Sequence, residues 1–328
     1  MNKRQKVASS TRSTKAKQEA QYRVRNWARY NQSLVQRGSL TFWIGEDVLD
    51  AWKPKLVGQR PRGAPQEYTD TAIECMLVLR AVFHLTLRGA EGFVRSLFEL
   101  AEIKVEVPDY TTLCKRAKGL SVKLPTTSQG PIHAVLDSSG LKLYGEGEWK
   151  VRQHGYSKRR TWRKLHLSVD SAAREIQAVV LTEAGVDDAE AAKRLLNQTQ
   201  APIEKLSADG AYDKRKVYQA CQQHEVSQIN IPPRRDAHIW QHGNSSKPPL
   251  VRDQNLRRIR QVGRKRWKQE TGYHQRSLGE NMVFRFKTIF GDHLASRQIP
   301  QQITEARIKC LALNRMTWLG MPESYRVA

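Results

Sequence analysis

The sequence has few cysteines and no long apolar run. Its 328 residues include only four cysteines, whose spacing matches neither a zinc site nor a disulfide framework. We therefore expect reduced, buried thiols and a cytoplasmic protein. No apolar run approaches the roughly 20 residues that a membrane-spanning helix needs. The basic N-terminal stretch has no apolar segment behind it, unlike a secretory signal. We expect no membrane partner.

Acidic residues are also scarce. The chain has 32 aspartates and glutamates against 56 lysines and arginines, which gives a formal net charge of +24. Such an excess attracts polyanions, so nucleic acid is the expected partner. A membrane surface is the alternative, but the amphipathic basic helix that it would require is not visible in the sequence.

The pattern divides the chain into a basic arm at 1–29, a helical region at 30–128 and an α/β region at 129–328. In the helical region, apolar residues recur at helical spacing in three short segments. The third, near 110–118, carries Lys115 and Arg116 away from its apolar side. This order suggests a helix-turn-helix whose last helix reads DNA. A plain helical bundle with a basic surface is the alternative.

The α/β region alternates strand and helix signals, which predicts a mixed sheet. Strands are expected at 132–137, 140–144, 165–169, 175–181, 205–209 and 228–231. We interpret Asp187 and Asp213 as helix caps. Basic insertions near 149–164 and 232–272 interrupt the pattern, and the first contains Trp149 and Trp162. Aromatic residues among cations suit stacking on unpaired bases. Alternatively, these tryptophans pack into the core.

The stretch 273–287 places an acid among cations if it is helical. At about 100° per residue, its Tyr273, Arg276, Glu280 and Lys287 fall within an arc of about 60°. Such a face can combine a metal-binding carboxylate with groups that contact phosphates. A solvated helix face with internal ion pairs is the alternative interpretation.

Two further acids are each expected at the end of a strand. Asp137 and Asp209 follow different strands of one sheet, so both could point into one crevice, where Glu280 could join them. Three carboxylates this close repel one another, and two Mg²⁺ ions would relieve that repulsion. Such a pair of ions supports displacement at phosphorus. Taken singly, either aspartate could instead be a turn former or cap.

Three sequence blocks resemble the DDE transposases of bacterial insertion sequences, close to the insertion sequence 5 group. They are Ala134-Val135-Leu136-Asp137-Ser138-Ser139-Gly140, Leu206-Ser207-Ala208-Asp209-Gly210-Ala211-Tyr212-Asp213, and the Tyr-x2-Arg-x3-Glu-x6-Lys signature at Tyr273, Arg276, Glu280 and Lys287. The resemblance implies an RNase H-like catalytic fold. It also implies two Mg²⁺ ions, replaceable by Mn²⁺, and a homodimer that cuts double-stranded DNA at terminal inverted repeats and joins the ends to target DNA.

The resemblance also assigns residue roles. Asp137, Asp209 and Glu280 become the catalytic metal ligands. The DNA-binding residues become Tyr273, Arg276 and Lys287 at the transposon-end phosphates, with Trp149 or Trp162 stacking on a displaced base. The protein would be cytoplasmic and associated with the nucleoid. Two other functions remain open at this stage: a non-catalytic DNA-binding regulator, and a metal-dependent nuclease that does not join strands.

Overall fold

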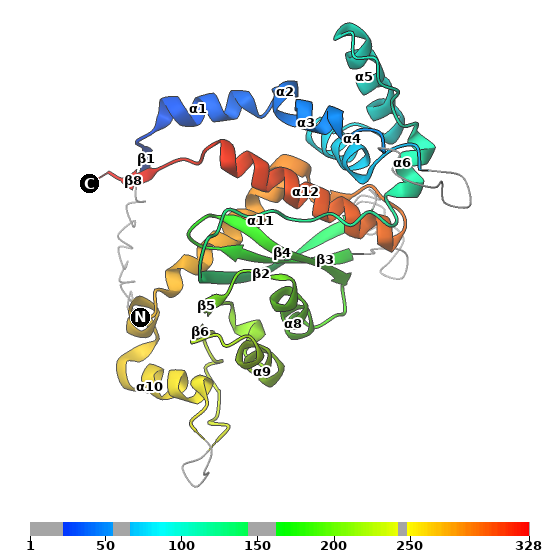
Figure 1. Cartoon of the computed structure of the whole chain (residues 1–328). Coiled ribbons are helices and arrows are strands. Elements are labelled where there is room, and N and C mark those ends of the chain that lie inside the picture. Colours follow the sequence, from blue (N-terminus) through cyan, green and yellow to red (C-terminus); the bar gives the residue numbers. More distant parts are fainter. Residues whose placement is uncertain (1–21, 55–65, 144–161, 242–247, 328) are drawn as a thin grey trace, which may run out of the picture.

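The computed structural model describes residues 22–54, 66–143, 162–241 and 248–327, and a mixed sheet lies at its centre. The strand order is β4-β3-β2-β5-β6, and β7 pairs with β2 (Figure 1). The strands are β2 (Ile132–Leu143), β3 (Trp162–Asp170), β4 (Glu175–Glu183), β5 (Ile203–Ser207), β6 (Gln228–Asn230) and β7 (His293–Leu294). The strand β3 is antiparallel to both β2 and β4, whereas β5 pairs parallel to β2 and β6 pairs parallel to β5.

Helices cover both faces of this sheet (Figure 1). One face carries α8 (Asp188–Gln198) and α9 (Arg215–Gln223), and the other carries α11 (Ser277–Phe290) and α12 (Ile299–Leu319). Each face has its own apolar cluster. Because both faces are covered, β4 is buried along almost its whole length and lacks the alternation of a half-exposed strand.

The strand β2 runs through Asp137 instead of ending there. We expected one strand at 132–137 and a second after a break, but β2 is continuous for 12 residues. Its antiparallel pairing with β3 extends from Ala134 opposite Asp170 to Lys142 opposite Trp162. This long ladder keeps the polar middle of β2 extended, so Asp137 lies within the strand.

The helical region is packed onto the sheet domain. It contains α1 (Trp27–Gln36), α2 (Leu40–Trp43), α3 (Glu46–Asp50), α4 (Asp70–Val82), α5 (Leu87–Leu100) and α6 (Tyr110–Arg116). Side chains of Thr69, Thr86 and Asp109 cap the last three. Residues of α4 and α12 share one apolar cluster, and β1 (Tyr22–Val24) pairs with β8 (Ser324–Arg326). The two regions are therefore joined by a common core.

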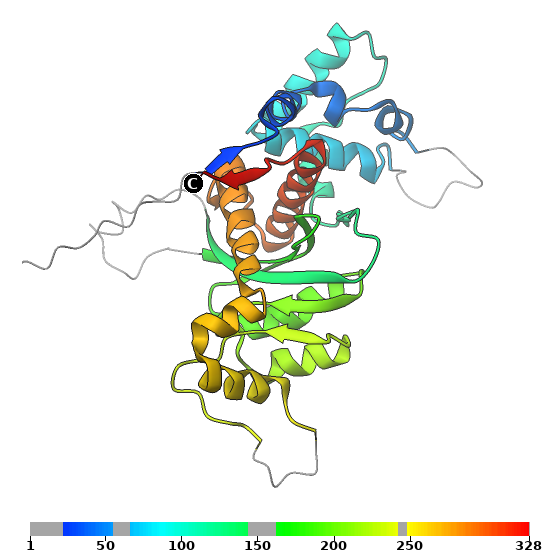
Figure 2. The same cartoon turned by 90° about the vertical axis from the view of Figure 1, so that its left-hand side faces the viewer.

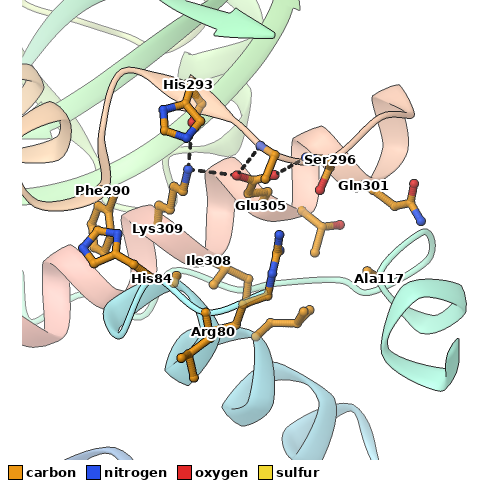
Figure 3. A pocket seen from close by; sticks show the side chains of 15 residues that line it. Arg80, His84, Ala117, Phe290, His293, Ser296, Gln301, Glu305, Ile308 and Lys309 are labelled. Atoms are coloured by element: carbon orange, nitrogen blue, oxygen red, sulfur yellow. Dashed lines mark hydrogen bonds and ion pairs between the residues drawn. The ribbon is translucent and has the colours of Figure 1, made fainter. Parts of the chain in front are cut away.

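A buried ion pair fixes the segment between α11 and α12 (Figure 3). Lys309 Nζ lies 2.8 Å from Glu305 Oε1, and both residues are 7% exposed. The same ammonium donates to the carbonyl of His293, while the carboxylate accepts from the amides of Ala295 and Ser296. Glu305 and Lys309 lie beside a cavity of about 260 Å³ between α4 and α12.

The helix cap predicted at Asp187 is confirmed, and the helix cap predicted at Asp213 is wrong. The Asp187 carboxylate accepts from the amide of Ala189 at the start of α8. Asp213 instead pairs with Arg252 of α10 (Val251–Glu270), and both side chains are buried. Lys214 occupies the cap position of α9 without a side-chain bond. None of the helices in the described ranges is both long and apolar enough to cross a membrane.

Candidate active site

Asp137 lies within β2, and Asp209 lies just past the end of the neighbouring parallel strand β5. The last paired residues of β2 and β5 are Val135 and Ser207, and each aspartate follows two residues later. Adjacent strands are about 4.8 Å apart, and residues two apart share a face of a sheet. Asp209 then starts the short 3-10 helix η1 (Gly210–Tyr212), whose first turn it caps through the amide of Ala211 at 2.9 Å.

A glycine brings α11 close to Asp137. A Cβ placed on Gly279 would lie 3.0 Å from the Cβ of Asp137 and 3.0 Å from Cγ1 of Val135. Only a residue without a side chain lets the helix backbone approach β2 this closely. Glu280 follows directly in the sequence, so this contact fixes where the third carboxylate leaves the helix.

Electrostatics connects the three acids. Burial raises the pKa of Asp137, and the carboxylates of Asp209 and Glu280 raise it further, whereas the Arg276 guanidinium lowers it. Burial and the same two carboxylates also raise the pKa of Tyr273, to about 12. Asp209 and Glu280 are therefore close enough to Asp137 to disfavour its charged form, and a divalent cation at this position would relieve that repulsion.

Glu280 is engaged by Arg276 in this form of the protein. The two side chains form an ion pair one helical turn apart, and the Glu280 side chain remains 56% exposed. No three histidine, cysteine, aspartate or glutamate side chains in the described residues are grouped to hold a metal ion. The donors themselves fit Mg²⁺, which prefers carboxylate oxygens.

The other signature residues lie on two elements and not on the single helix that we expected. We expected one helix over 273–287, but residues Tyr273–Arg276 form the 3-10 helix η2, and α11 begins at Ser277. Tyr273 is 8% exposed, and its hydroxyl donates to the carbonyl of Ala208, next to Asp209. Lys287 is half-buried two turns after Glu280, on the same side of α11.

The other DNA-binding candidates belong to other segments of the chain. Trp149 lies outside the described residues. Trp162 begins β3 and packs across Gly140, with the ammonium of Lys142 6.0 Å from the ring centroid. On α6, Lys115 is exposed.

Arg116 of α6 is turned back onto the protein. Its guanidinium donates to the carboxylate of Asp70 and to the carbonyl of Tyr68. In this form, therefore, one of the two basic candidates on α6 is already engaged in contacts that hold α6 to the start of α4.

Sequence reasoning missed the polar groups that dock η2 against the sheet. The carbonyl of Thr271 accepts from Nζ of Lys205 and from Nδ2 of Asn230. On the neighbouring strand, the two ring nitrogens of His133 bond to Gln275 and Ser207. These residues are far apart in the sequence and share no motif spacing. Gly279 had a usable signal, because a glycine inside an amphipathic helix often marks a close approach.

Comparisons with known proteins identify the family of this chain. Two family models, both described as a transposase DDE domain, match residues 35–146 and 128–315. A chain of the cryo-EM structure of a piggyBac transposase synaptic complex with hairpin DNA is also similar. Its identity is 11% and its TM-score 0.36, over 86% of this chain and 73% of that one. So low a TM-score leaves the assignment to the family models. Because the second model alone spans more than half of the chain, the protein belongs to the DDE transposases, enzymes that cleave DNA and transfer strands.

Proposed function

We propose that the protein is the transposase of a bacterial insertion sequence of the insertion sequence 5 group. It binds the terminal inverted repeats, hydrolyses the phosphodiester bonds there and joins the 3′-hydroxyl ends to target DNA. The observation that supports this most is geometric: Asp137 and Asp209 each follow by two residues a paired position of neighbouring strands, and Gly279, next to Glu280, lies against Asp137. The strand order β4-β3-β2-β5-β6, with three antiparallel strands followed by two parallel ones, supports an RNase H-like catalytic domain.

Asp137, Asp209 and Glu280 are the proposed ligands of two Mg²⁺ ions, for which Mn²⁺ would substitute. When bound, the ions lower the pKa of the attacking water or hydroxyl and neutralise the charge on the leaving oxygen. Asp137 and Asp209 supply two fixed positions, because one lies within β2 and the other caps η1. Glu280 supplies the movable one, because it is exposed and held by a single arginine.

The remaining signature residues are proposed to position DNA. Once Glu280 has left it, Arg276 has a free guanidinium for a phosphate of the transposon end. Lys287 extends the same side of α11, and Tyr273 holds the turn before Asp209 until DNA binds. Trp162 and Trp149 are proposed to stack on a displaced base.

The helical region is proposed to bind the inverted repeat through α4 to α6, with Lys115 and Arg116 at the DNA. The transposase would act as a homodimer that pairs two ends, in the cytoplasm and on the nucleoid.

The substitution Glu280→Gln tests the catalytic assignment. We expect it to abolish Mg²⁺-dependent cleavage of a duplex carrying the terminal repeat while leaving DNA binding intact. Glu183→Gln is the matched control, since Glu183 is an exposed acid at the far end of β4. Undiminished cleavage by the Glu280 variant would favour a non-catalytic DNA-binding regulator or a different active site. A pre-cut end supplied with a target plasmid tests the nuclease alternative, because only a transposase joins the two.

A further inference from the structure

Three arginines line a cavity of about 530 Å³ on a different face of α11 from Glu280. Arg37 comes from the end of α1, Arg174 from the turn between β3 and β4, and Arg285 from α11 itself. The segment that follows α12 closes one side. Figure 2 shows α11 (orange) extending from α10 up to the β1–β8 pair, and the cavity is lined by residues along this helix from Leu278 to Ile289.

Among the described residues, no carboxylate lines the cavity beside these arginines. The cavity lining contains no aspartate or glutamate, and none of the three forms an ion pair with an acid in the described parts of the chain. Arg285 donates to the hydroxyl of Thr317 at 3.1 Å, and Arg174 makes a long contact of 3.5 Å with the carbonyl of Pro322. These neutral acceptors do not compensate three guanidinium charges.

Several of the guanidinium N–H groups are buried without an acceptor. They are Nε and Nη2 of Arg37 and Nη2 of Arg285, for which the described residues supply no hydrogen-bond partner. A guanidinium presents five donors and stays protonated, so buried donors without acceptors cost free energy. Such donors mark a place where an acceptor from another molecule would be stabilising.

The cluster is also strained. Burial lowers the pKa of Arg285, and the neighbouring Arg37 and Arg174 lower it further, to about 10. Arg174 has a φ of 57°, in the left-handed region that residues other than glycine rarely adopt. Folding therefore keeps three like charges together at an energetic cost.

We propose that this arginine cleft, formed by Arg37, Arg174 and Arg285, binds a phosphodiester group of DNA. The inference rests on the proposed function in taking DNA as the bound polymer. Three converging guanidinium groups match the several oxygens of a phosphate. The rim supports a nucleic acid over a carboxylate partner, since Phe284 is 68% exposed beside Asn281 and offers an apolar surface to a sugar or base.

The cleft would hold a different stretch of DNA from the candidate active site. Arg285 follows Glu280 by five residues, which places it about 140° around the helix and about 7.5 Å along it. A duplex segment seated on the carboxylates cannot also lie over the opposite side of α11. The cleft is therefore a second DNA contact of the same chain, separated from the first by the width of one helix.

The double substitution Arg37→Gln and Arg174→Gln tests the cleft by DNA affinity. The probe is a fluorescein-labelled 30-base-pair duplex, titrated at several KCl concentrations. We expect binding several-fold weaker at low salt and a slope of log affinity against log salt that is shallower by about 0.9, because the variant neutralises one phosphate fewer. Arg194→Gln on α8 removes an exposed arginine from the other face of the sheet and serves as the control, with no change in slope expected.

A melting experiment without DNA separates binding from folding. The double variant should not melt earlier than the wild type, because it loses no ion pair and relieves repulsion. Inorganic phosphate should raise the melting temperature of the wild type more than that of the variant. If the wild type binds the duplex and the double variant shows the same slope of log affinity against log salt, this inference alone is overturned. If the double variant has the same salt slope as the wild type but a different oligomer mass, the inference is overturned in favour of a carboxylate from a second copy of the chain. Absence of duplex binding by the wild type would overturn the proposed function itself.

Discussion

Gly279 offers a direct way to disturb the candidate active site without removing a ligand. In the substitution Gly279→Ala, the new methyl carbon would lie 3.0 Å from Cβ of Asp137 and 3.0 Å from Cγ1 of Val135. Carbon atoms pack at about 3.5–4.0 Å, so α11 or β2 has to move by about 0.5–1 Å. That movement would change the spacing between Glu280 and Asp137.

The expected cost in stability is small and the expected cost in activity is large. Overpacking of this kind costs about 1–3 kcal/mol, and alanine returns up to about 1 kcal/mol through its higher helix propensity. With the full gain of about 1 kcal/mol, net destabilisation is about 0–2 kcal/mol by these two principles. A displacement of about 1 Å at reacting groups can reduce a rate by about 100-fold. The assay is Mg²⁺-dependent cleavage of a labelled terminal-repeat duplex, alongside urea unfolding.

Gly92→Ala is the matched control for this substitution. Gly92 lies inside α5, and a Cβ added there meets nothing within 4 Å. We expect unchanged cleavage and equal or slightly higher stability. Wild-type cleavage by the Gly279 variant, with the same dependence on Mg²⁺ concentration, would refute the reasoning that the approach of α11 to β2 positions Glu280.

Two further predictions concern charged groups. Asp137→Asn should raise the melting temperature of the metal-free protein at neutral pH, because the pKa of Asp137 is raised above its ordinary value of 3.8 and its charged form is therefore unfavourable in the folded state. The gain in melting temperature should disappear as the pH falls through the raised pKa of Asp137. A variant that melts below the wild type at neutral pH would contradict this prediction. Lys309→Met should cost about 3–5 kcal/mol in urea unfolding, since it leaves Glu305 buried without its partner. A loss below about 1 kcal/mol, as for a surface pair, would show that the pair contributes little.

The sheet could be predicted from the sequence because its strands are apolar and bounded by turn residues. β3, β4 and β5 lie where the apolar runs predicted them, within a few residues at the ends. The continuity of β2 could not be predicted, because its middle is polar and glycine-containing and is held extended by pairing with β3. That pairing is a long-range interaction without a local signal.

For the acids too, local sequence predicts some roles, and tertiary contacts decide the others. Asp187 caps a helix as its local sequence predicts, whereas Asp213 has an equally good local sequence and pairs instead with Arg252, 39 residues away. The same limit applies to the candidate site. Spacing alone placed Glu280 and Lys287 on one helix face, but the ion pair of Glu280 with Arg276 and the buried hydroxyl of Tyr273 depend on tertiary packing. The arginine cleft draws on three separate segments and has no sequence signature.

Counting bound Mn²⁺ ions by electron paramagnetic resonance tests the shared metal site most directly. The protein is titrated in complex with an uncleaved terminal-repeat duplex, as the wild type and as Asp209→Asn. Asparagine can still accept from the amide of Ala211 and keep the turn, so the substitution removes chiefly the charge. We expect two Mn²⁺ per chain in the wild type and fewer, more weakly bound ions in the variant. Equal numbers and affinities in both proteins would contradict the convergence of Asp137, Asp209 and Glu280 on one pair of ions.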